Sequence, residues 1–182
     1  MANAIGIVEF TSISRGIFSS DQMVKVSDVE IVTASSTCPG KYIAIVTGDV
    51  ESVKESVSVG EKTADEFWID SIIIPNVSPL VFPAITGATM PEKVQALGVI
   101  EAFSIANMVV AADKILKSAS LEPIELRLGT GLGGKSYFTF TGNVGAVEVG
   151  IEAGKAEMEE KGLLVNAEVI PSPSDRLIQT LF

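Results

Sequence analysis

Histidine is absent from this chain of 182 residues. The imidazole side chain is the usual general base, the usual partner of a catalytic nucleophile and the commonest metal ligand in proteins. Its absence argues against conventional hydrolase chemistry, and we do not expect an enzyme of that kind.

Basic residues are few: 13 lysines and arginines stand against 23 aspartates and glutamates, which gives a formal net charge of −10. A chain of that charge repels the phosphate backbone of nucleic acids and the headgroups of anionic lipids. We therefore expect no nucleic-acid partner.

Long apolar runs are also missing. Stretches such as Ser71–Asn76 are interrupted long before the roughly 18–20 residues needed to cross a bilayer. Residues 1–6 lack the basic region and apolar core of a signal peptide. We therefore expect no membrane span and a chain that stays in the cytosol.

Cysteine occurs once, as Cys38, which fits a reducing compartment. The following Pro39-Gly40 is turn chemistry, so we place the thiol at a loop tip rather than in a strand. Thiolates select zinc, copper(I) or iron–sulfur clusters, and a cluster usually takes four of them. Either several copies of Cys38 come together, or this thiol is an idle small hydrophobe.

The sequence does contain an internal repeat. Ala4–Glu9 is matched position for position by Ala96–Glu101, 92 residues later. Two further pairs of segments align, the second at a spacing of 94: Asp21–Lys25 with Asp113–Lys117, and Thr47–Val50 with Thr141–Val144. This period is too long for a solenoid, whose units run roughly 20–50 residues, and indicates a duplicated domain. We predict a first domain over residues 1–91 and a second over residues 92–182.

Each half has the same order of elements: a short strand, a helix, a hairpin of two strands, a second helix and a closing strand. Asp49 and Asn143 each follow a glycine and are expected to cap the second helix by accepting a backbone N–H bond. We predict an α+β fold, an α/β sandwich with helices on one face of a sheet, present twice.

Apolar residues recur on one face of each expected helix, as in amphipathic helices that pack on a core. In the first helix of each half they are Ile13, Ile17 and Val24, and then Ile105, Val109, Ala112 and Leu116. In the second helix of each half we expect these to face the core: Val50, Val53 and Val57, and then Val144, Val147 and Ile151.

The aligned segments Ala-Ile-Gly-Ile-Val-Glu, Asp-x-Met-Val-Lys and Thr-Gly-Asp-Val resemble the signature of bacterial microcompartment (BMC) shell domains. Both halves carry it, and the resemblance covers nearly the whole chain. It implies the ferredoxin-like BMC fold in tandem. In that family single domains form hexamers that tile into a sheet, and tandem chains form trimers that imitate hexamers. The resemblance therefore implies a structural homotrimer, a pseudohexamer in a microcompartment shell, with other BMC shell proteins as partners.

By the same resemblance, Cys38 falls in the loop that lines the central pore. A cysteine there is similar to the iron–sulfur type of tandem shell protein found in propanediol-utilising compartments. This implies that three Cys38 thiolates hold one [4Fe-4S] cluster, prone to loss in air, for electron transfer across the shell or cluster delivery. A cytosolic reductase is the implied redox partner. The implied pore-lining residues are Thr37, Cys38, Pro39 and Gly40, with Gly131, Leu132, Gly133 and Gly134 in the second half.

Lys25 and Lys117 match the lysine at which neighbouring hexamers meet in BMC shell sheets. The resemblance implies the same shell-edge contact in this chain. Taken without it, each lysine is explained by solvation at the end of a helix.

One motif points to another class of function. Gly129–Ser136 matches G-x-x-x-x-G-K-[ST], the phosphate-binding P-loop. A P-loop runs into a helix whose N-terminus faces the phosphates, whereas Tyr137–Thr141 is aromatic and β-branched and predicts a strand. We interpret the segment as a glycine loop and keep a nucleotide-binding enzyme as a remote alternative. The nearer alternative is a metal-free shell protein whose pore passes a small metabolite.

Glu9 and Glu101 recur at matching positions and could be mistaken for a catalytic carboxylate pair. No histidine or partner motif lies near either one to tune its pKa. We interpret both as strand-end residues bonded to backbone or water.

Overall fold

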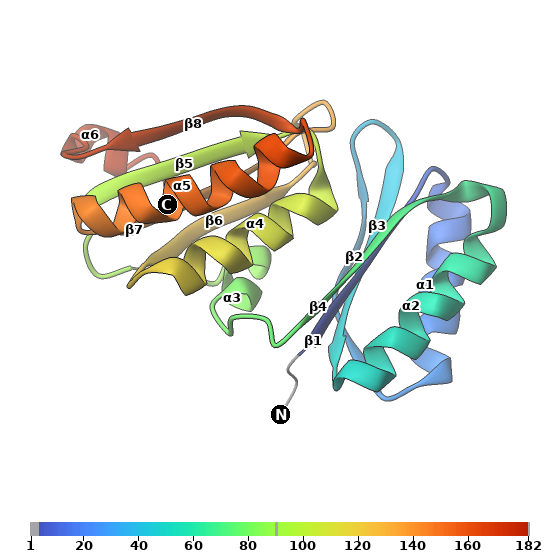
Figure 1. The fold of residues 1–182 in the computed structure, drawn as a ribbon. Helices are drawn as coiled ribbons and strands as arrows, with labels where there is room; N and C mark the ends of the chain where they lie inside the picture. The colour runs from blue at the N-terminus through green and yellow to red at the C-terminus, as the bar shows by residue number, and fades with distance from the viewer. Residues whose placement is uncertain (1–3, 90, 182) are drawn as a thin grey trace. The chain divides into compact units, whose positions relative to one another are not determined.

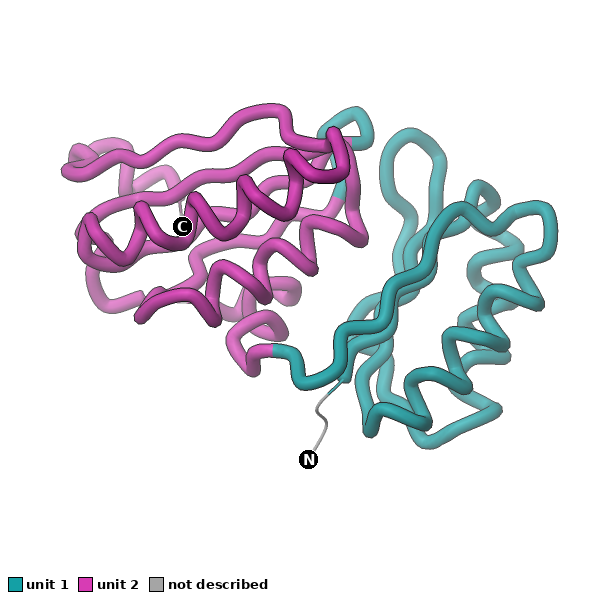
Figure 2. The backbone as a smooth tube through the Cα atoms, in the orientation of Figure 1, with its two compact units in different colours: residues 1–77, 129–134 teal, residues 78–128, 135–182 magenta. Residues whose placement is uncertain are grey.

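The computed structural model describes residues 4–89 and 91–181, which form two compact units. One unit consists of residues 1–77 together with 129–134, and the other of residues 78–128 together with 135–182 (Figure 2). Each unit contains a four-stranded antiparallel sheet and the helices that pack on it. The α+β fold predicted twice along the chain is therefore confirmed.

The first unit follows the predicted order of elements (Figure 1). They are β1 (Ala4–Phe10), α1 (Ile13–Val26), β2 (Val29–Thr37), β3 (Lys41–Gly48), α2 (Val50–Ala64), a short 3-10 helix (Asp65–Phe67) and β4 (Trp68–Pro75). The strands lie in the order β2-β3-β1-β4, and every neighbouring pair is antiparallel. Helices α1 and α2 pack side by side against one face of this sheet.

The second unit repeats this arrangement. Its elements are β5 (Ala96–Ala102), α4 (Ile105–Ser118), β6 (Glu122–Leu128), β7 (Ser136–Gly142), α5 (Val144–Glu160) and β8 (Leu164–Ile170). The strand order β6-β7-β5-β8 is that of the first sheet. A short helix also follows the closing strand of each half, α3 (Val81–Thr86) and α6 (Asp175–Ile178). Helix α3 packs against β6 and α4, and so belongs to the second unit.

The hairpin registers fix where the loops of interest begin and end. In the first sheet the last paired residues of β2 and β3 are Thr37 and Lys41, so Cys38, Pro39 and Gly40 form the loop. In the second sheet Leu128 pairs with Ser136, and the longer glycine loop lies between them.

The predicted helix caps are confirmed. The Asp49 carboxylate accepts the backbone N–H groups of Glu51 and Ser52, each at 3.0 Å, at the start of α2. The Asn143 side-chain oxygen accepts the backbone N–H of Ala146 at 2.9 Å at the start of α5. These bonds satisfy amide groups that the first helical turn leaves without partners.

The apolar face of α1 is not its buried face. Ile13 and Ile17 are 42% and 54% exposed, and α1 instead buries these residues: Gly16, Ser19, Ser20 and Met23. In α4 the matching residues Ile105 and Val109 are buried, so hydrophobic periodicity and burial agree there. In α1 they disagree because three of its four buried residues, Gly16, Ser19 and Ser20, have small side chains that a hydrophobicity pattern does not count.

Gly16 explains why α1 needs small residues on its packed face. A Cβ added there would lie 2.5 Å from the ring of Tyr42 on β3, which is too close for a real contact. The absence of a side chain therefore sets how closely α1 approaches β3.

The core faces predicted for α2 and α5 are largely correct. Four of the six residues predicted to face the core are buried: Val53, Val57, Val147 and Ile151. Val144, in the first turn of α5, is 38% exposed, which corrects the prediction for that residue. Val50 is partly exposed at the start of α2.

Candidate functional site

Cys38 lies at the tip of the β2–β3 hairpin, as the Pro-Gly sequence predicted. Its thiol is free and its side chain half-buried, whereas Pro39 and Gly40 are exposed and Thr37 is buried at the end of β2. Gly40 has a φ of +77°, a backbone conformation that glycine adopts at no steric cost. The sulfur therefore lies at the tip of a two-stranded hairpin, half-buried and partly accessible.

The glycine loop supplies a hydrogen bond to this sulfur. Residues 129–134 belong to the same compact unit as the Cys38 hairpin, and the backbone N–H of Gly131 donates to Cys38 Sγ at 3.4 Å. Position 134 approaches Pro39 as well, because an added Cβ there would lie 3.6 Å from Pro39 Cδ. At the repeat spacing of 94 residues Cys38 corresponds to Leu132, but the group that contacts the sulfur is the amide one residue earlier, at Gly131.

The donor set around Cys38 is small. Over residues 4–89 and 91–181, no three histidine, cysteine, aspartate or glutamate side chains come together in a way that could hold a metal ion. Each chain thus contributes a single thiol. The same described residues include no helix that is long and apolar enough to span a bilayer.

The P-loop motif does not have P-loop geometry. Its loop leads into strand β7, as predicted, so no helix N-terminus faces the position that a phosphate would occupy. Lys135, the lysine of the motif, pairs with the carboxylate of Glu101 at 2.5 Å. The nucleotide-binding alternative therefore lacks both of the features that bind phosphate.

The ion pair of Lys135 has a counterpart in the first unit. Lys41 lies 3.6 Å from the carboxylate of Glu9, which is 3% exposed. In each half a lysine that follows the hairpin loop thus reaches the acidic residue near the end of the central strand. Glu9 and Glu101 were expected to bond to backbone or water, whereas each also pairs with a lysine. The dipeptide Gly-Lys recurs at 40–41 and 134–135, and this recurrence is the sequence signal for the two ion pairs.

The two lysines expected at the shell edge occupy matching places. Lys25 and Lys117 lie in the last turns of α1 and α4, and each pairs with the aspartate four residues earlier, at 2.5 and 2.7 Å. Asp113 also accepts the backbone N–H of Ser78 at 2.7 Å, which ties the chain after β4 to α4. Lys25 is the more exposed of the two lysines.

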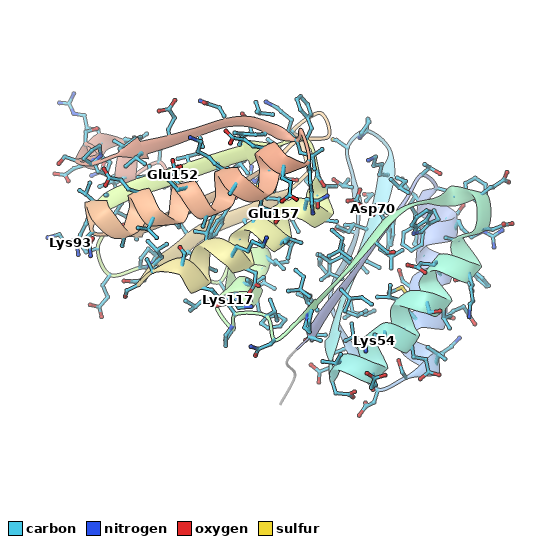
Figure 3. The ribbon with its side chains drawn as sticks, in the orientation of Figure 1. Lys54, Asp70, Lys93, Lys117, Glu152 and Glu157 are labelled. Carbon is cyan, nitrogen blue, oxygen red and sulfur yellow. The ribbon has the colours of Figure 1, made fainter. Side chains whose placement is uncertain are left out.

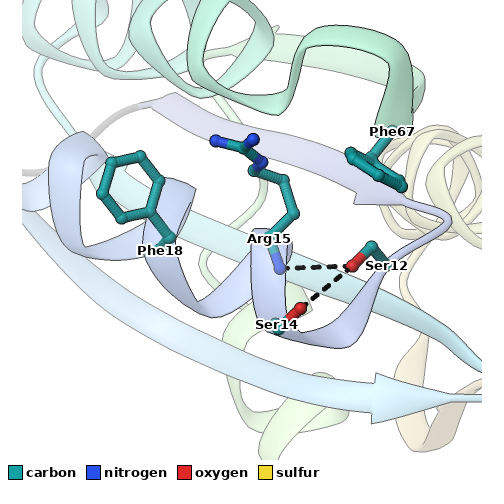
Figure 4. A pocket seen from close by; sticks show the side chains of 5 residues that line it. All are labelled: Ser12, Ser14, Arg15, Phe18 and Phe67. Atoms are coloured by element: carbon teal, nitrogen blue, oxygen red, sulfur yellow. Dashed lines mark hydrogen bonds between the residues drawn. The ribbon is translucent and has the colours of Figure 1, made fainter.

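A pocket at the start of α1 was not foreseen from the sequence. It is lined by five residues from α1 and the segment before β4: Ser12, Ser14, Arg15, Phe18 and Phe67 (Figure 4). The Arg15 guanidinium lies 5.6 Å from the ring centre of Phe18 and 5.9 Å from that of Phe67, both within cation–π range. The Ser12 hydroxyl caps the helix by accepting the backbone N–H of Arg15.

A buried carboxylate joins α4 to α5. Glu157, labelled on α5 in Figure 3, is 5% exposed. Its carboxylate pairs with the ammonium groups of Lys114 and Lys161. Burial raises the pKa of Glu157, but the hydrogen bonds from the two lysines outweigh burial and leave its pKa below the ordinary value. Lys161 also donates to the side chain of Asn107, so the cluster is a structural link between the two helices.

Tyr137 on β7 forms a second polar cluster with Glu125 and Arg127 of β6. Burial raises the pKa of Tyr137 to about 12, and its hydrogen bond to the Glu125 carboxylate acts in the same direction. The phenol therefore stays protonated at neutral pH and serves as a hydrogen-bond donor.

Comparison with known proteins identifies the repeated unit. The model of the family described as the BMC domain matches residues 4–77 and, again, residues 96–173. The chain belongs to the BMC shell-protein family. It contains two BMC domains in tandem, as the sequence resemblance implied.

Individual relatives agree with this assignment. The chain is 35% identical to the bacterial microcompartment shell protein PduT of Citrobacter freundii, over 97% of this chain and 96% of that protein. It is 30% identical to the carboxysome assembly protein CcmO of Synechococcus elongatus, over 99% of this chain and 69% of that protein. A crystal structure of a microcompartment protein from Desulfitobacterium hafniense DCB has a TM-score of 0.95 and 45% identity, over 98% of this chain and 99% of that one.

The similarity to these relatives indicates a structural role. They are shell and assembly proteins rather than enzymes, and this tandem BMC protein is likewise a structural one. The Cys38 turn and the glycine loop are then the same hairpin loop of the two BMC domains, and only the first carries a thiol.

Proposed function

We propose that this tandem BMC protein forms a homotrimer that tiles a microcompartment shell as a pseudohexamer, and that Cys38 from three chains binds one [4Fe-4S] cluster at the central pore. The cluster serves electron transfer across the shell or cluster delivery, with a cytosolic reductase as the redox partner. The two BMC domains extend over residues 1–91 and 92–182.

The observation that carries the proposal is the placement of Cys38. It is a free, half-accessible thiol at the tip of a hairpin, and the glycine loop reaches the same sulfur. The similarity to PduT, over almost the full length of both chains, supports a shell role for a chain with this thiol.

The thiolate of Cys38 can hold a cluster only if several chains share that cluster. One thiolate is too few for any iron–sulfur cluster, and the described residues around Cys38 add no carboxylate or imidazole to it. Three chains around a threefold axis would supply three thiolates. A bound cluster would supply one-electron redox chemistry, while the chain itself supplies the thiolate, the amide that touches it and the loop that limits access.

The other candidate residues are assigned to the pore and to the edge of the shell tile. We assign to the pore lining the residues of the two hairpin loops: Thr37, Cys38, Pro39, Gly40, Gly131, Leu132, Gly133 and Gly134. Lys25 and Lys117 are assigned to the contacts with neighbouring BMC shell proteins. Their aspartate partners hold both ammonium groups near the ends of their helices.

A second candidate keeps the shell role and omits the metal. It is favoured by the small donor set, because one thiol per chain in a loop is also compatible with a simple pore rim for a small metabolite. The two candidates differ in whether Cys38 is needed for anything beyond assembly.

Anaerobic reconstitution with ferrous iron and sulfide separates them. We expect the wild-type protein to gain a brown chromophore and, after reduction, an electron paramagnetic resonance signal, and Cys38→Ser to gain neither while remaining a trimer. A chromophore and signal of equal intensity in Cys38→Ser would exclude Cys38 as the ligand. No chromophore in either protein would favour the metal-free pore.

A further inference from the structure

We propose that Gly131 is a positioning residue for the Cys38 thiolate, acting through its backbone N–H. This inference rests on the proposed role of Cys38 as a metal ligand and adds to it a hydrogen-bond donor from the glycine loop. The residue acts on the sulfur and not on the metal, so its contribution can be measured with and without the cluster.

The contact has the geometry of a hydrogen bond to sulfur. The amide nitrogen of Gly131 lies 3.4 Å from Cys38 Sγ, with the hydrogen directed at it. Over the described residues the sulfur has no other hydrogen-bond partner, and no ion pair reaches it. A thiolate placed there would therefore meet this single amide as its polar neighbour within the chain.

The local backbone explains why the amide at position 131 points at the sulfur. The N–H of Leu132 bonds to the carbonyl of Gly129, so Gly131 occupies the third position of a turn. Its φ of +75° is what a type II turn requires at that position, and glycine reaches it without steric cost. Four of the six loop residues adopt positive φ in the same way: Gly129, Gly131, Gly133 and Gly134. The glycines of Gly129–Ser136 that match the P-loop motif are thus explained by the backbone conformation of a tight loop beside Cys38.

The chemical effect follows from the charge on sulfur. Hydrogen bonds to cysteine sulfurs are among the groups that set the reduction potentials of iron–sulfur centres, because they stabilise the more negative state. Each chain of a trimer would contribute one such bond. The glycine loop would therefore favour the reduced state and hold the thiolate in one orientation for binding.

Three variants separate the hydrogen bond from the shape of the loop. Gly131→Pro removes the N–H and cannot keep a φ of +75°. Gly133→Pro disturbs the same loop, since Gly133 has a φ of +61°, but leaves the N–H of Gly131 in place. Gly131→Asn keeps the N–H, tolerates the left-handed region better than other side chains, and meets open space at the added Cβ.

The first measurement needs no metal. In the 15N-labelled metal-free protein, we expect the amide resonance of Gly131 to move when Cys38 is replaced by alanine or alkylated with iodoacetamide, and that of Gly133 to stay. An unmoved Gly131 amide would overturn the contact. If it moves but the wild-type protein takes up no cluster, then the positioning of the thiol stands and the proposed metal role fails.

The second measurement uses the reconstituted protein. For Gly131→Pro we expect the reduction potential to become more negative, with the reduction equilibrium about tenfold less favourable, or about 59 mV for one electron. Gly131→Asn should retain the wild-type potential, and Gly133→Pro should shift it by much less than Gly131→Pro. Equal shifts in the two proline variants would assign the effect to loop shape and overturn the role of the amide.

Discussion

The ammonium group of Lys135 lies 2.5 Å from the carboxylate of Glu101, and this ion pair fastens the end of the glycine loop to the central strand of its sheet. The same pairing recurs between Lys41 and Glu9 in the first unit, at 3.6 Å. The lysine that completes a phosphate-binding motif in the sequence is therefore engaged by a carboxylate in the structure.

This pairing predicts that the chain does not bind nucleotides. Calorimetric titration of magnesium ATP into the wild-type protein should give no binding heat, because the loop has neither a helix N-terminus nor a free lysine to meet the phosphates. Lys135→Ala should give the same flat titration. Saturable binding by the wild type that is lost in Lys135→Ala would revive the enzyme hypothesis.

Gly16→Ala should destabilise the chain by about 1–3 kcal/mol, because its Cβ would overlap the ring of Tyr42 and force α1 away from the sheet. Urea denaturation followed by circular dichroism measures the change. Gly145→Ala in α5 is the matched control. Its added Cβ meets only the Asn143 side-chain oxygen at 3.6 Å, and alanine should stabilise the helix by up to about 1 kcal/mol. Equal stabilities of the two variants would contradict the packing described for α1.

Glu157→Gln should destabilise the chain by about 1–3 kcal/mol near pH 7, because Lys114 and Lys161 then lose their anionic partner. The folded-state pKa of Glu157 is lowered, so its contribution is complete above the unfolded value of about 4.3 and is lost as pH falls through the folded value. The stability difference between wild type and variant should accordingly shrink below about pH 4. A difference that is the same at pH 7 and pH 3 would refute the linkage.

Asn143→Ala should cost about 1 kcal/mol of unfolding free energy, since the backbone N–H of Ala146 loses its acceptor. Asn143→Asp should be nearly neutral at pH 7, because Asp49 fills the same place at the start of α2. Thermal and urea denaturation of the three proteins test this. If Asn143→Ala and Asn143→Asp lost the same amount of unfolding free energy, Asn143 would stabilise the chain by an interaction other than the helix cap.

Lys25→Ala should weaken the assembly of trimers into sheets without changing the stability of the chain, because the side chain is 65% exposed and its ion-pair partner Asp21 is itself 49% exposed. Electron microscopy of assembled sheets reports the first effect and urea denaturation the second. Lys54→Ala, which removes an exposed lysine paired with Glu51 on α2, is the control and should assemble normally. If both variants assemble alike, Lys25 is only a solvated lysine at a helix end.

Much of the fold was predictable because the sequence contains the same domain twice. The matched segments that begin at Ala4 and Ala96 predicted the central strands, and the glycines before Asp49 and Asn143 indicated where two helices start. Hydrophobic periodicity failed on α1, since it assigned importance to Ile13 and Ile17, whereas the face that packs carries Gly16, Ser19 and Ser20. Small residues at a close helix–strand contact leave no apolar signal in a single sequence.

The candidate site was predictable in position but not in its contacts. Pro39-Gly40 placed Cys38 at a hairpin tip, and the repeat indicated that a glycine loop is its counterpart. The bond from the Gly131 amide depends on one backbone orientation, which no residue type specifies. The Arg15 pocket was missed for a related reason, because Arg15 reaches the ring of Phe67 only after the chain between them has folded.

The central claim is that three chains share one cluster through Cys38. Native mass spectrometry of the anaerobically reconstituted protein tests it most directly, because the mass counts chains and bound atoms together. The account predicts a species of three chains carrying a single [4Fe-4S] unit, and three bare chains for Cys38→Ser. A trimer of the wild-type chain that takes up no iron, or one that binds a separate cluster for every chain, would contradict it.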